Sequence, residues 1–218
     1  MPAIVDKSAK RAEIIRHAAE TFSRTGYHAT KMQDIATQAD IGKGTIYEYF
    51  RTKEELFLAI YDSWMTEFES IVRQRVDAAD DAMSKVDAIR GSAVEFYESR
   101  AGQAPLLLEF WAHALRTDNT VFLTRVQRTR QFLHELGTQL TQQLVHSGWF
   151  TDVDVEAFTH LESGISDGIF LAWLLDGRQF PLAKAYTFRQ SVIGLGLLSD
   201  TGRNVLSERL SAKLKRGF

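Results

Sequence analysis

The stretch IGKGTIYEYFRTKEEL, residues 41–56, places two glycines, a lysine and two tyrosines just before a charged helix start. Glycine beside lysine and threonine is typical of a phosphate-binding loop, whereas tyrosines and a lysine on one short helix are typical of a nucleic-acid-binding surface. The phosphate-loop motif, aligned on Gly42 and Lys43, requires glycine at 37 and serine or threonine at 44. The chain has Thr37 and Gly44, and no buried strand precedes them, so we exclude a Walker-type nucleotide site.

Helix signals lie on both sides of this stretch. Upstream, Ile14, Ala18 and Phe22 recur at i, i+4 and i+8, which is the spacing of one helix face. Gly26 stands where a glycine commonly ends a helix, because it adopts the left-handed conformation without strain. We therefore expect a first helix over about Ser8–Thr25.

Two capping boxes mark the next helix starts. In Thr30–Gln33 and Thr52–Glu55, a threonine is followed three residues later by a side chain that can return to the backbone at the helix start. The first box predicts a short helix with Ile35 on its inner face, and the second predicts the start of a long helix. Another short helix between them carries Ile46 and Phe50 one turn apart. This order predicts a helix-turn-helix unit followed by a long exit helix.

The second short helix of such a unit is the one that enters the major groove of DNA. If Ile46 and Phe50 anchor it to the core, Lys43 and Tyr47 point outward, because residues four apart share a helix face. Gly44 has no side chain, so the backbone there can approach a duplex closely. Helix N-termini in addition favour phosphate oxygens. The residues expected to contact DNA are Thr30, Lys31, Lys43, Gly44, Thr45, Tyr47, Tyr49 and Lys53.

Four short patterns occur together at fixed spacings in this region: F-x-x-x-G-Y-x-x-T from Phe22, I-A-x-x-A from Ile35, G-x-G-T-I-Y-x-Y-F from Gly42 and K-E-x-L from Lys53. In this combination the segment from Arg11 to Asp62 closely resembles the DNA-binding domain of TetR-family transcriptional regulators. The resemblance implies an all-α homodimer whose C-terminal domain binds an effector. The family often has histidine at the position of Tyr49.

Composition agrees with a soluble globular protein and gives no global attraction to DNA. The 218-residue chain is 44% hydrophobic and 25% charged, with a net charge of −2. The segment from Arg24 to Lys53, however, contains five basic and three acidic residues, so it carries a net positive charge. The absence of cysteine excludes disulfides and thiolate sites, and no signal peptide or membrane span is evident. We expect a cytoplasmic protein that does not contact a membrane.

The fold expected is all-α, with a helix-turn-helix DNA-binding domain over residues 1–52 and an effector-binding and dimerisation domain over residues 53–218. A long helix from about Thr52 joins the two. A basic amphipathic tail with Leu206, Leu210 and Leu214 facing inward ends the chain. The other expected helices cover Asp81–Ser99, a segment from Ala104 or Pro105, a segment from Asn119 or Thr120 to Gly148, Asp154–Leu175 and Pro181–Leu198.

Small residues recur along the two helices that precede the tail. Residues of this kind give a helix a bare face that lets another backbone come close. This face predicts a four-helix interface between two subunits, which is also where the family resemblance places it. The alternative, tight packing within one subunit, remains open. The expected interface residues are Gly164, Gly168, Ala172, Ser191, Gly194 and Leu198.

An effector site is expected among the aromatic residues of the middle helices. Glu109 and His113 lie one turn apart in an otherwise apolar helix, either as a hydrogen-bonded pair lining a cavity or at its edge. Aromatic surroundings favour a small hydrophobic or planar effector, whose identity stays open. The candidate residues are Phe68, Glu109, Phe110, Trp111, His113, Phe132 and Phe170.

Two catalytic motifs fail on their context. Residues 164–168 fit G-x-S-x-G, but they interrupt a helical stripe instead of following a strand. His134 and Glu135 begin H-E-x-x-H, but position 138 is threonine. We expect no catalytic site, metal or cofactor, which disfavours a helical enzyme that uses its helix-turn-helix for protein contacts. The function expected is a repressor released from a palindromic operator by a small hydrophobic effector; an activator or an effector-independent DNA-binding protein remains the alternative.

Overall fold

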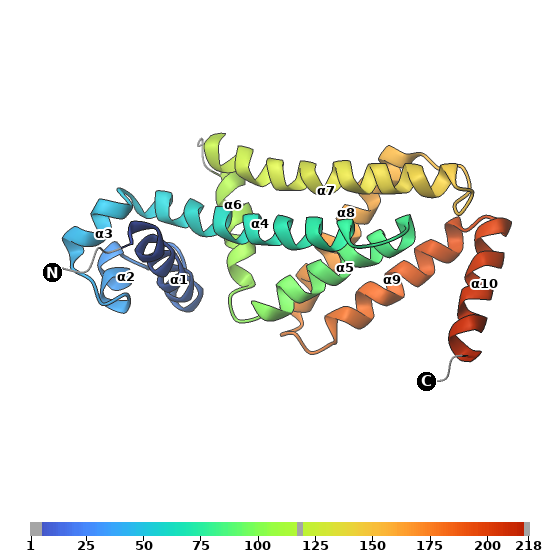
Figure 1. Ribbon diagram of the computed structural model, residues 1–218. Helices are drawn as coiled ribbons and strands as arrows, with labels where there is room; N and C mark the ends of the chain where they lie inside the picture. The colour runs from blue at the N-terminus through green and yellow to red at the C-terminus, as the bar shows by residue number, and fades with distance from the viewer. Residues whose placement is uncertain (1–5, 117–119, 216–218) are drawn as a thin grey trace. The chain divides into compact units, whose positions relative to one another are not determined.

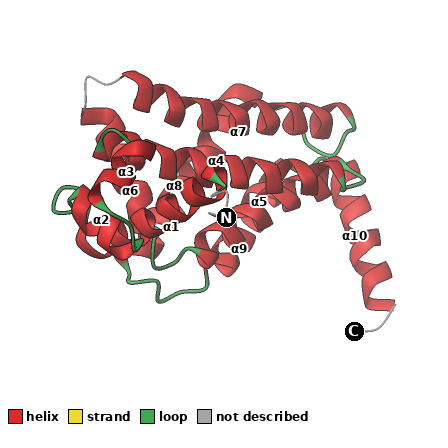
Figure 2. Ribbon diagram, turned by 60° about the vertical axis from the view of Figure 1, so that its left-hand side comes forward, coloured by secondary structure: helices red, strands yellow, loops and turns green. Residues whose placement is uncertain are grey.

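The computed structural model describes residues 6–116 and 120–215, with side chains as far as Glu208. Over these residues the chain forms ten α-helices and no β-strand, as expected (Figure 1). Figure 2 shows that turns and short loops connect the helices. The helices are α1 (Lys7–Thr25), α2 (Met32–Gln38), α3 (Lys43–Tyr49), α4 (Lys53–Asp77), α5 (Ala82–Ser99), α6 (Pro105–Arg116), α7 (Thr120–His146), α8 (Val155–Leu175), α9 (Leu182–Leu197) and α10 (Asp200–Lys215).

Local capping explains why most of these boundaries agree with the sequence. The Asp6 carboxylate accepts a hydrogen bond from the Ser8 amide at 2.9 Å, and α1 ends at Gly26, whose φ is +78°. Asp154 caps α8 in the same way, accepting from the Ala157 amide at 3.0 Å. Such bonds satisfy backbone donors that have no partner inside the helix. The expected start at Asn119 lies outside the described residues, and α7 is described from Thr120.

The predicted capping box at the start of α4 is present. The Glu55 amide donates to the Thr52 hydroxyl at 3.0 Å. The Glu55 carboxylate accepts from the Arg51 amide at 2.8 Å, one residue before the position that the motif predicts. These two bonds set the start of the long exit helix.

The chain divides into two compact units, which we describe separately. The first contains residues 1–70 and 99–129, and the second contains residues 71–98 and 130–218. Helices α4 and α7 contribute residues to both. The predicted division into residues 1–52 and 53–218 stays a prediction, because a boundary by function is not the same as a boundary by contacts.

Aromatic packing forms the core of the first unit. Phe57 of α4 lies at its centre, with ring centroids 5.4 Å from Phe22, 4.3 Å from Phe110 and 5.7 Å from Phe122. These four rings are fully buried. Because Phe22 belongs to α1 and Phe110 to α6, this packing joins the first helix to a helix from the middle of the sequence, and α1 and α6 are in contact.

The second unit has a tightly built corner where the α7–α8 turn meets the start of α10. Phe150 and Leu198 form an isolated backbone bridge and pack with Leu144. A Cβ at Gly202 would overlap the Trp149 carbonyl, so only glycine fits there. Leu206 packs on this cluster, as predicted for the tail, whereas the side chains of Leu210 and Leu214 lie outside the described residues.

The part of the chain that the structure describes contains neither a membrane-spanning helix nor a metal cluster. No helix there is long and apolar enough to cross a membrane. No group of three or more histidine, aspartate or glutamate side chains there is placed to hold a metal ion.

Candidate nucleic-acid interface

Helix α3 has one buried side and one exposed side. Ile46 and the capping residue Phe50 are fully buried, while Lys43 is exposed and Tyr47 keeps 43% of its surface accessible. Thr45 and Tyr49 lie half-buried on the flanks of the helix. The predicted orientation of α3 is thus confirmed, because the residues four apart that were expected inside are inside. DNA contact by the outward residues stays a prediction.

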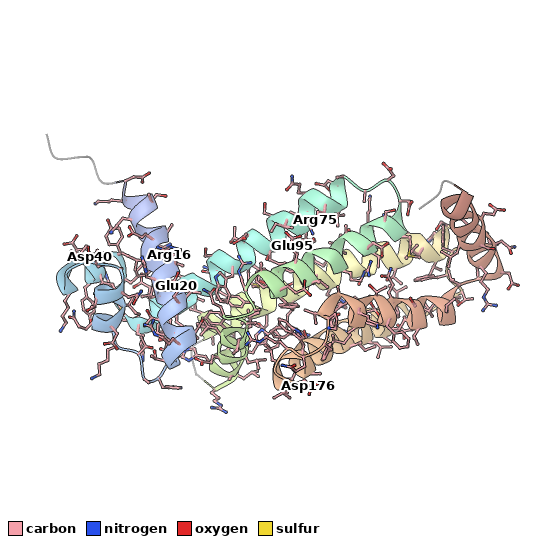
Figure 3. The ribbon with its side chains drawn as sticks, turned by 90° about the horizontal axis from the view of Figure 1, so that it is seen from below. Arg16, Glu20, Asp40, Arg75, Glu95 and Asp176 are labelled. Atoms are coloured by element: carbon pink, nitrogen blue, oxygen red, sulfur yellow. The ribbon has the colours of Figure 1, made fainter. Side chains whose placement is uncertain are left out.

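The turn before α3 brings its N-terminus to the surface. Asp40, labelled in Figure 3, has a φ of +51°, and the Ile41 amide donates to the Ala36 carbonyl at 3.0 Å. Gly44, in the first turn of α3, is exposed, and a Cβ built there would meet no atom within 4 Å. The backbone at Gly44 is therefore open to solvent on the outward side of the helix.

Thr30 does not lie on this surface. Its side chain is only 1% exposed, and its hydroxyl donates to the Gly26 carbonyl at 2.8 Å and lies 2.5 Å from the Thr25 hydroxyl. The expectation that this hydroxyl contacts phosphate is wrong, because the hydroxyl is buried and already paired. The predicted capping box is also displaced by one residue: the Lys31 amide donates to the Asp34 carboxylate at 2.8 Å.

Lys53 is turned toward the loop between α1 and α2. Its ammonium donates to the carbonyl oxygens of Tyr27 at 2.7 Å, Thr30 at 3.0 Å and His28 at 3.3 Å. An ammonium has three N–H donors, so these carbonyls use all of them. Burial lowers the pKa of Lys53, although three carbonyl acceptors favour its charged form. The expected phosphate contact therefore disagrees with the arrangement found, in which Lys53 holds the loop.

Tyr27, in that loop, contacts two other helices. Its amide donates to the Glu109 carboxylate of α6 at 2.9 Å. Its ring lies 4.4 Å from the Lys53 ammonium and has its centroid 4.4 Å from that of Phe57. The same residue thus contacts α4 and α6 just before the helix-turn-helix begins.

Glu109 and His113 do not form the pair that the sequence suggested. Glu109 bonds the Tyr27 amide, while the His113 imidazole lies 3.1 Å from the Glu54 carboxylate, at the start of α4. The His113 ring also packs edge-on against Tyr27, at a centroid distance of 5.1 Å. Both residues join α6 to the DNA-binding segment, and their role at an effector cavity stays a prediction. Sequence reasoning missed these contacts because the partners lie far away in the chain.

The aromatic effector candidates are spread over both units. Phe68 and Phe110 are buried and Trp111 is half-buried in the first unit, so two of the three lie in its core. In the second unit, Phe170 is fully buried and stacked on Tyr97 at 4.2 Å, and the Phe132 ring lies under the Arg73 guanidinium at 4.3 Å. The seven candidates therefore do not form one continuous group inside either unit.

A cavity of about 450 Å³ lies elsewhere, in the second unit. Its volume is in the range of small-molecule sites, which span roughly 300–1,000 Å³. None of the seven candidates lines it, and sequence reasoning did not find it. Its wall is formed by Asp81, Ala82, Met83, Gln143, Leu144, His146, Ser147 and Trp149.

A buried polar cluster joins α8 to α9. The Arg189 side chain is 10% exposed and donates to the Ser166 hydroxyl at 2.5 Å, and its guanidinium lies 3.3 Å from the Glu162 carboxylate. The Tyr186 hydroxyl donates to the Ser166 carbonyl at 3.1 Å. Burial raises the pKa of Glu162, and the Arg189 charge opposes that rise. This cluster holds α8 and α9 in their packed arrangement. No sequence motif predicted it.

Helices α8 and α9 also carry exposed apolar side chains. Leu161, Leu171 and Leu175 on α8 are 41–75% exposed, and Phe188, Val192 and Leu195 on α9 are 56–71% exposed. Gly164, Gly168 and Ala172 lie exposed along the same part of α8, and a Cβ at either glycine would meet nothing within 4 Å. No helix of the described chain crosses closely at these glycines. The alternative of tight packing within one subunit is therefore not supported at these positions.

On α9 the predicted interface residues divide. Ser191 is exposed and Gly194 half-buried, with no described atom within 4 Å of a Cβ at Gly194. Leu198 is only 4% exposed, because it packs with Leu144 and Phe150 in the corner beside α10. Its assignment to an intersubunit surface is therefore wrong: the side chain is already used inside its own chain.

Two family models match the chain. Residues 14–60 match the model of bacterial regulatory proteins of the tetR family, and residues 82–193 match the C-terminal domain of BetI-type transcriptional repressors. The first range contains α2, α3 and the start of α4, and the second runs from α5 into α9. Together the two models cover both the candidate DNA surface and most of the remaining helices.

The chain is also similar in sequence to individual transcriptional regulators. The chain is 25% identical over 177 residues to the fatty acid metabolism regulator protein of Bacillus subtilis, covering 81% of this chain and 89% of the relative. It is 28% identical over 156 residues to an uncharacterised HTH-type transcriptional regulator of the same organism, covering 72% and 67%.

Solved structures show the same fold. The transcriptional regulator FadR from Bacillus subtilis, in complex with stearoyl-CoA, has a TM-score of 0.71 at 20% identity and covers 81% of this chain and 93% of its own. A TetR transcription regulator from Haloarcula marismortui has a TM-score of 0.79 at 20% identity and covers 88% and 100%. At these identities the structures establish the fold alone.

Proposed function

The chain belongs to the TetR family of DNA-binding transcriptional regulators, which are not enzymes, and we propose that it is a cytoplasmic, homodimeric repressor released from a palindromic operator by a small hydrophobic effector. The observation that carries this proposal is the outward face of α3. Ile46 and Phe50 hold the helix to the core while Lys43 and Tyr47 face solvent. A short helix anchored on one side and polar on the other is what the major groove accepts.

On this surface each residue has a specific task. Lys43 reaches phosphates or guanine acceptors, and Gly44 lets the backbone approach. Tyr47 offers a ring for a thymine methyl and a hydroxyl for phosphate. Thr45, Tyr49 and Lys31 contact the flanking backbone or base edges. In this proposal Thr30 and Lys53 support the loop before α2 instead of contacting DNA, a role that is supported by their polar contacts within the chain.

The partner in the dimer is a second copy of the chain, bound through α8 and α9. Three leucines of α8 and three apolar residues of α9 are exposed. Patches of this kind on a soluble protein commonly mark an interface. A two-fold axis through it would place two α3 helices on successive half-sites, roughly 34–36 Å apart. The two-fold symmetry of such a dimer implies a palindromic operator.

The effector is proposed to be a long-chain acyl compound, bound by the helices outside the DNA-binding segment. Support comes from a relative described as a fatty acid metabolism regulator protein and from a structural neighbour solved with stearoyl-CoA. An acyl chain also fits the hydrophobic effector that the aromatic residues favour. The ligand acts only through its different affinity for the DNA-bound and released states, and inverting a 1:99 population requires about 5.5 kcal/mol.

The test has two steps. Random duplexes are first selected in vitro by the wild-type protein, and an enriched palindrome is expected. Stearoyl-CoA and free CoA are then titrated against the selected duplex. Release by stearoyl-CoA but not by CoA supports the repressor with an acyl effector. Selection without enrichment of any sequence would contradict operator binding, whereas tighter binding with acyl-CoA would contradict release by this effector.

A further inference from the structure

Arg11 lies beside the C-terminal end of α3, and the candidate site described above gives it no role. Arg11, on α1, has its guanidinium carbon 4.7 Å from the centre of the Phe50 ring. Phe50 is the residue that caps α3 at its C-terminus. A guanidinium over an aromatic ring uses its flat face, so its N–H donors at the edges stay available. Arg11 is also exposed to solvent.

The acidic groups near Arg11 are engaged by other cations. Glu13, two residues along, accepts from the Lys10 ammonium at 2.8 Å. Asp62 of α4 pairs with Arg125 at 3.8 Å. Burial raises the pKa of Asp62, and the charges of three arginines oppose that rise. Among these three, Arg11 has the smallest effect. Over residues 6–116 and 120–208, no hydrogen bond or ion pair of the Arg11 guanidinium is formed.

We propose that Arg11 binds a backbone phosphate of the operator beside the C-terminal end of α3, so that α1 is a second DNA-contacting element. This inference rests on the proposed DNA-binding function and extends it to a residue outside the helix-turn-helix. A helix that lies in the major groove has phosphates at both of its ends. Lys43 serves the N-terminal end, and Arg11 serves the other. The planar guanidinium matches the phosphate oxygens, and the Phe50 ring holds it in place before binding.

The alternative role for Arg11 is to cover the Phe50 ring, and two variants separate the roles. Arg11→Met keeps an apolar side chain over the ring and removes the charge, and Arg11→Gln removes the charge with a polar side chain. Arg11→Lys keeps the charge. The matched control is Arg16→Met on the same helix, where the wild-type guanidinium pairs with Glu20 at 2.8 Å (Figure 3). The probe is the duplex selected in vitro with the wild type.

The measured quantity is the slope of log K against log salt between 50 and 200 mM KCl. Each lost phosphate contact reduces this slope by about 0.9, so Arg11→Met and Arg11→Gln should flatten it by about two units per dimer. The fall in affinity over that salt range then becomes about tenfold smaller than in the wild type. Arg11→Lys and Arg16→Met should keep the wild-type slope. Thermal melting of every variant shows which of them are folded.

A folded Arg11→Met or Arg11→Gln variant whose slope changes by less than about one unit overturns the proposal, because the residue then serves only to cover Phe50. Flattening by Arg16→Met to the same extent would also overturn it, since the effect would belong to any positive charge on α1. A wild-type slope near zero is a different result. It would contradict DNA binding itself and not only the role of Arg11.

Discussion

The Glu109 carboxylate of α6 accepts a hydrogen bond from the Tyr27 amide at 2.9 Å, across 82 positions of sequence. Tyr27 lies in the loop that leads into the helix-turn-helix, and its carbonyl is bonded by Lys53. A shift of α6 therefore acts on the backbone just before α2 without passing through the outward face of α3. This contact gives a physical route by which events at α6 can change how the DNA-binding segment is held.

Removing the Glu109 carboxylate should loosen that loop. Glu109→Ala leaves the Tyr27 amide without its partner, which typically costs about 1–3 kcal/mol when the donor is buried. Glu109→Gln keeps a carbonyl acceptor and should lie much closer to the wild type. The free energy of unfolding in urea measures the difference. Equal losses in both variants would mean that the charge, and not the hydrogen bond, matters.

Tyr47→Ala and Lys43→Ala should each sharply weaken operator binding while leaving the melting temperature nearly unchanged. The reason is that both side chains are exposed and neither belongs to the core. Fluorescence anisotropy on the selected duplex and thermal melting provide the two measurements. Ile46→Ala is the opposite control, because it removes a fully buried side chain and should destabilise the fold by about 2–5 kcal/mol. A Tyr47→Ala variant that binds normally would show that this face of α3 does not meet DNA.

Lys53→Met should destabilise the protein without flattening the salt dependence of DNA binding. The substitution leaves the carbonyls of Tyr27, His28 and Thr30 without their shared donor. Lys53→Arg, which retains a donor, should recover part of the stability. Paired measurements of urea unfolding and of the log K against log salt slope distinguish the roles. A slope about two units flatter in a stably folded Lys53→Met protein would restore the phosphate-contact interpretation.

Gly168→Leu should separate folding from dimerisation. A Cβ built there meets nothing within 4 Å in the described part of the chain, so the subunit should remain helical by circular dichroism. At an intersubunit contact the added bulk typically costs about 1–3 kcal/mol. Sedimentation velocity should show a larger monomer fraction than in the wild type, and Gly91→Leu, on α5, is a control at another glycine with open space around it. An unaltered dimer would place the interface elsewhere.

Glu162 should make a pH-dependent contribution to stability. Its pKa is raised by burial above the ordinary value of 4.5, so the folded chain holds this proton more tightly than the unfolded chain. The resulting stabilisation is complete below about pH 4.5 and is lost as pH rises through the folded-state pKa. Glu162→Gln cannot ionise, so its stability relative to the wild type should increase from pH 4 to pH 7. Urea unfolding across that range measures the trend, and a difference that stays constant or falls with pH would contradict it.

The helix boundaries and the orientation of α3 could be predicted because their causes are local. A cap such as Asp154 acts within three residues, and Ile46 and Phe50 lie one turn apart on the same helix. The same locality explains the error at Thr30. A threonine three residues before a glutamine looks like a cap, but its hydroxyl is taken by the Gly26 carbonyl of the preceding turn.

The remaining differences concern partners that lie far away in sequence. Lys53 reaches back to the loop at Tyr27, and Glu109 comes from a helix in the middle of the chain. Leu198 continues a pattern of small and apolar residues along α9, yet it faces Phe150. The periodicity of apolar residues predicts which side chains share a helix face, but it does not predict which part of the chain packs against that face. The polar cluster around Arg189 was missed for the same reason.

If the exposed apolar residues of α8 and α9 form the proposed dimer interface, DNA binding depends on the concentration of the chain. Where most of the protein is monomeric, the amount of dimer grows with the square of the chain concentration, so operator occupancy rises more steeply than expression does. Doubling the chain concentration would then raise the amount of dimer fourfold, and dilution by growth would lower it disproportionately. Six exposed side chains, among them Leu175 and Phe188, would thus set a threshold for gene control that no residue on the DNA-binding face determines.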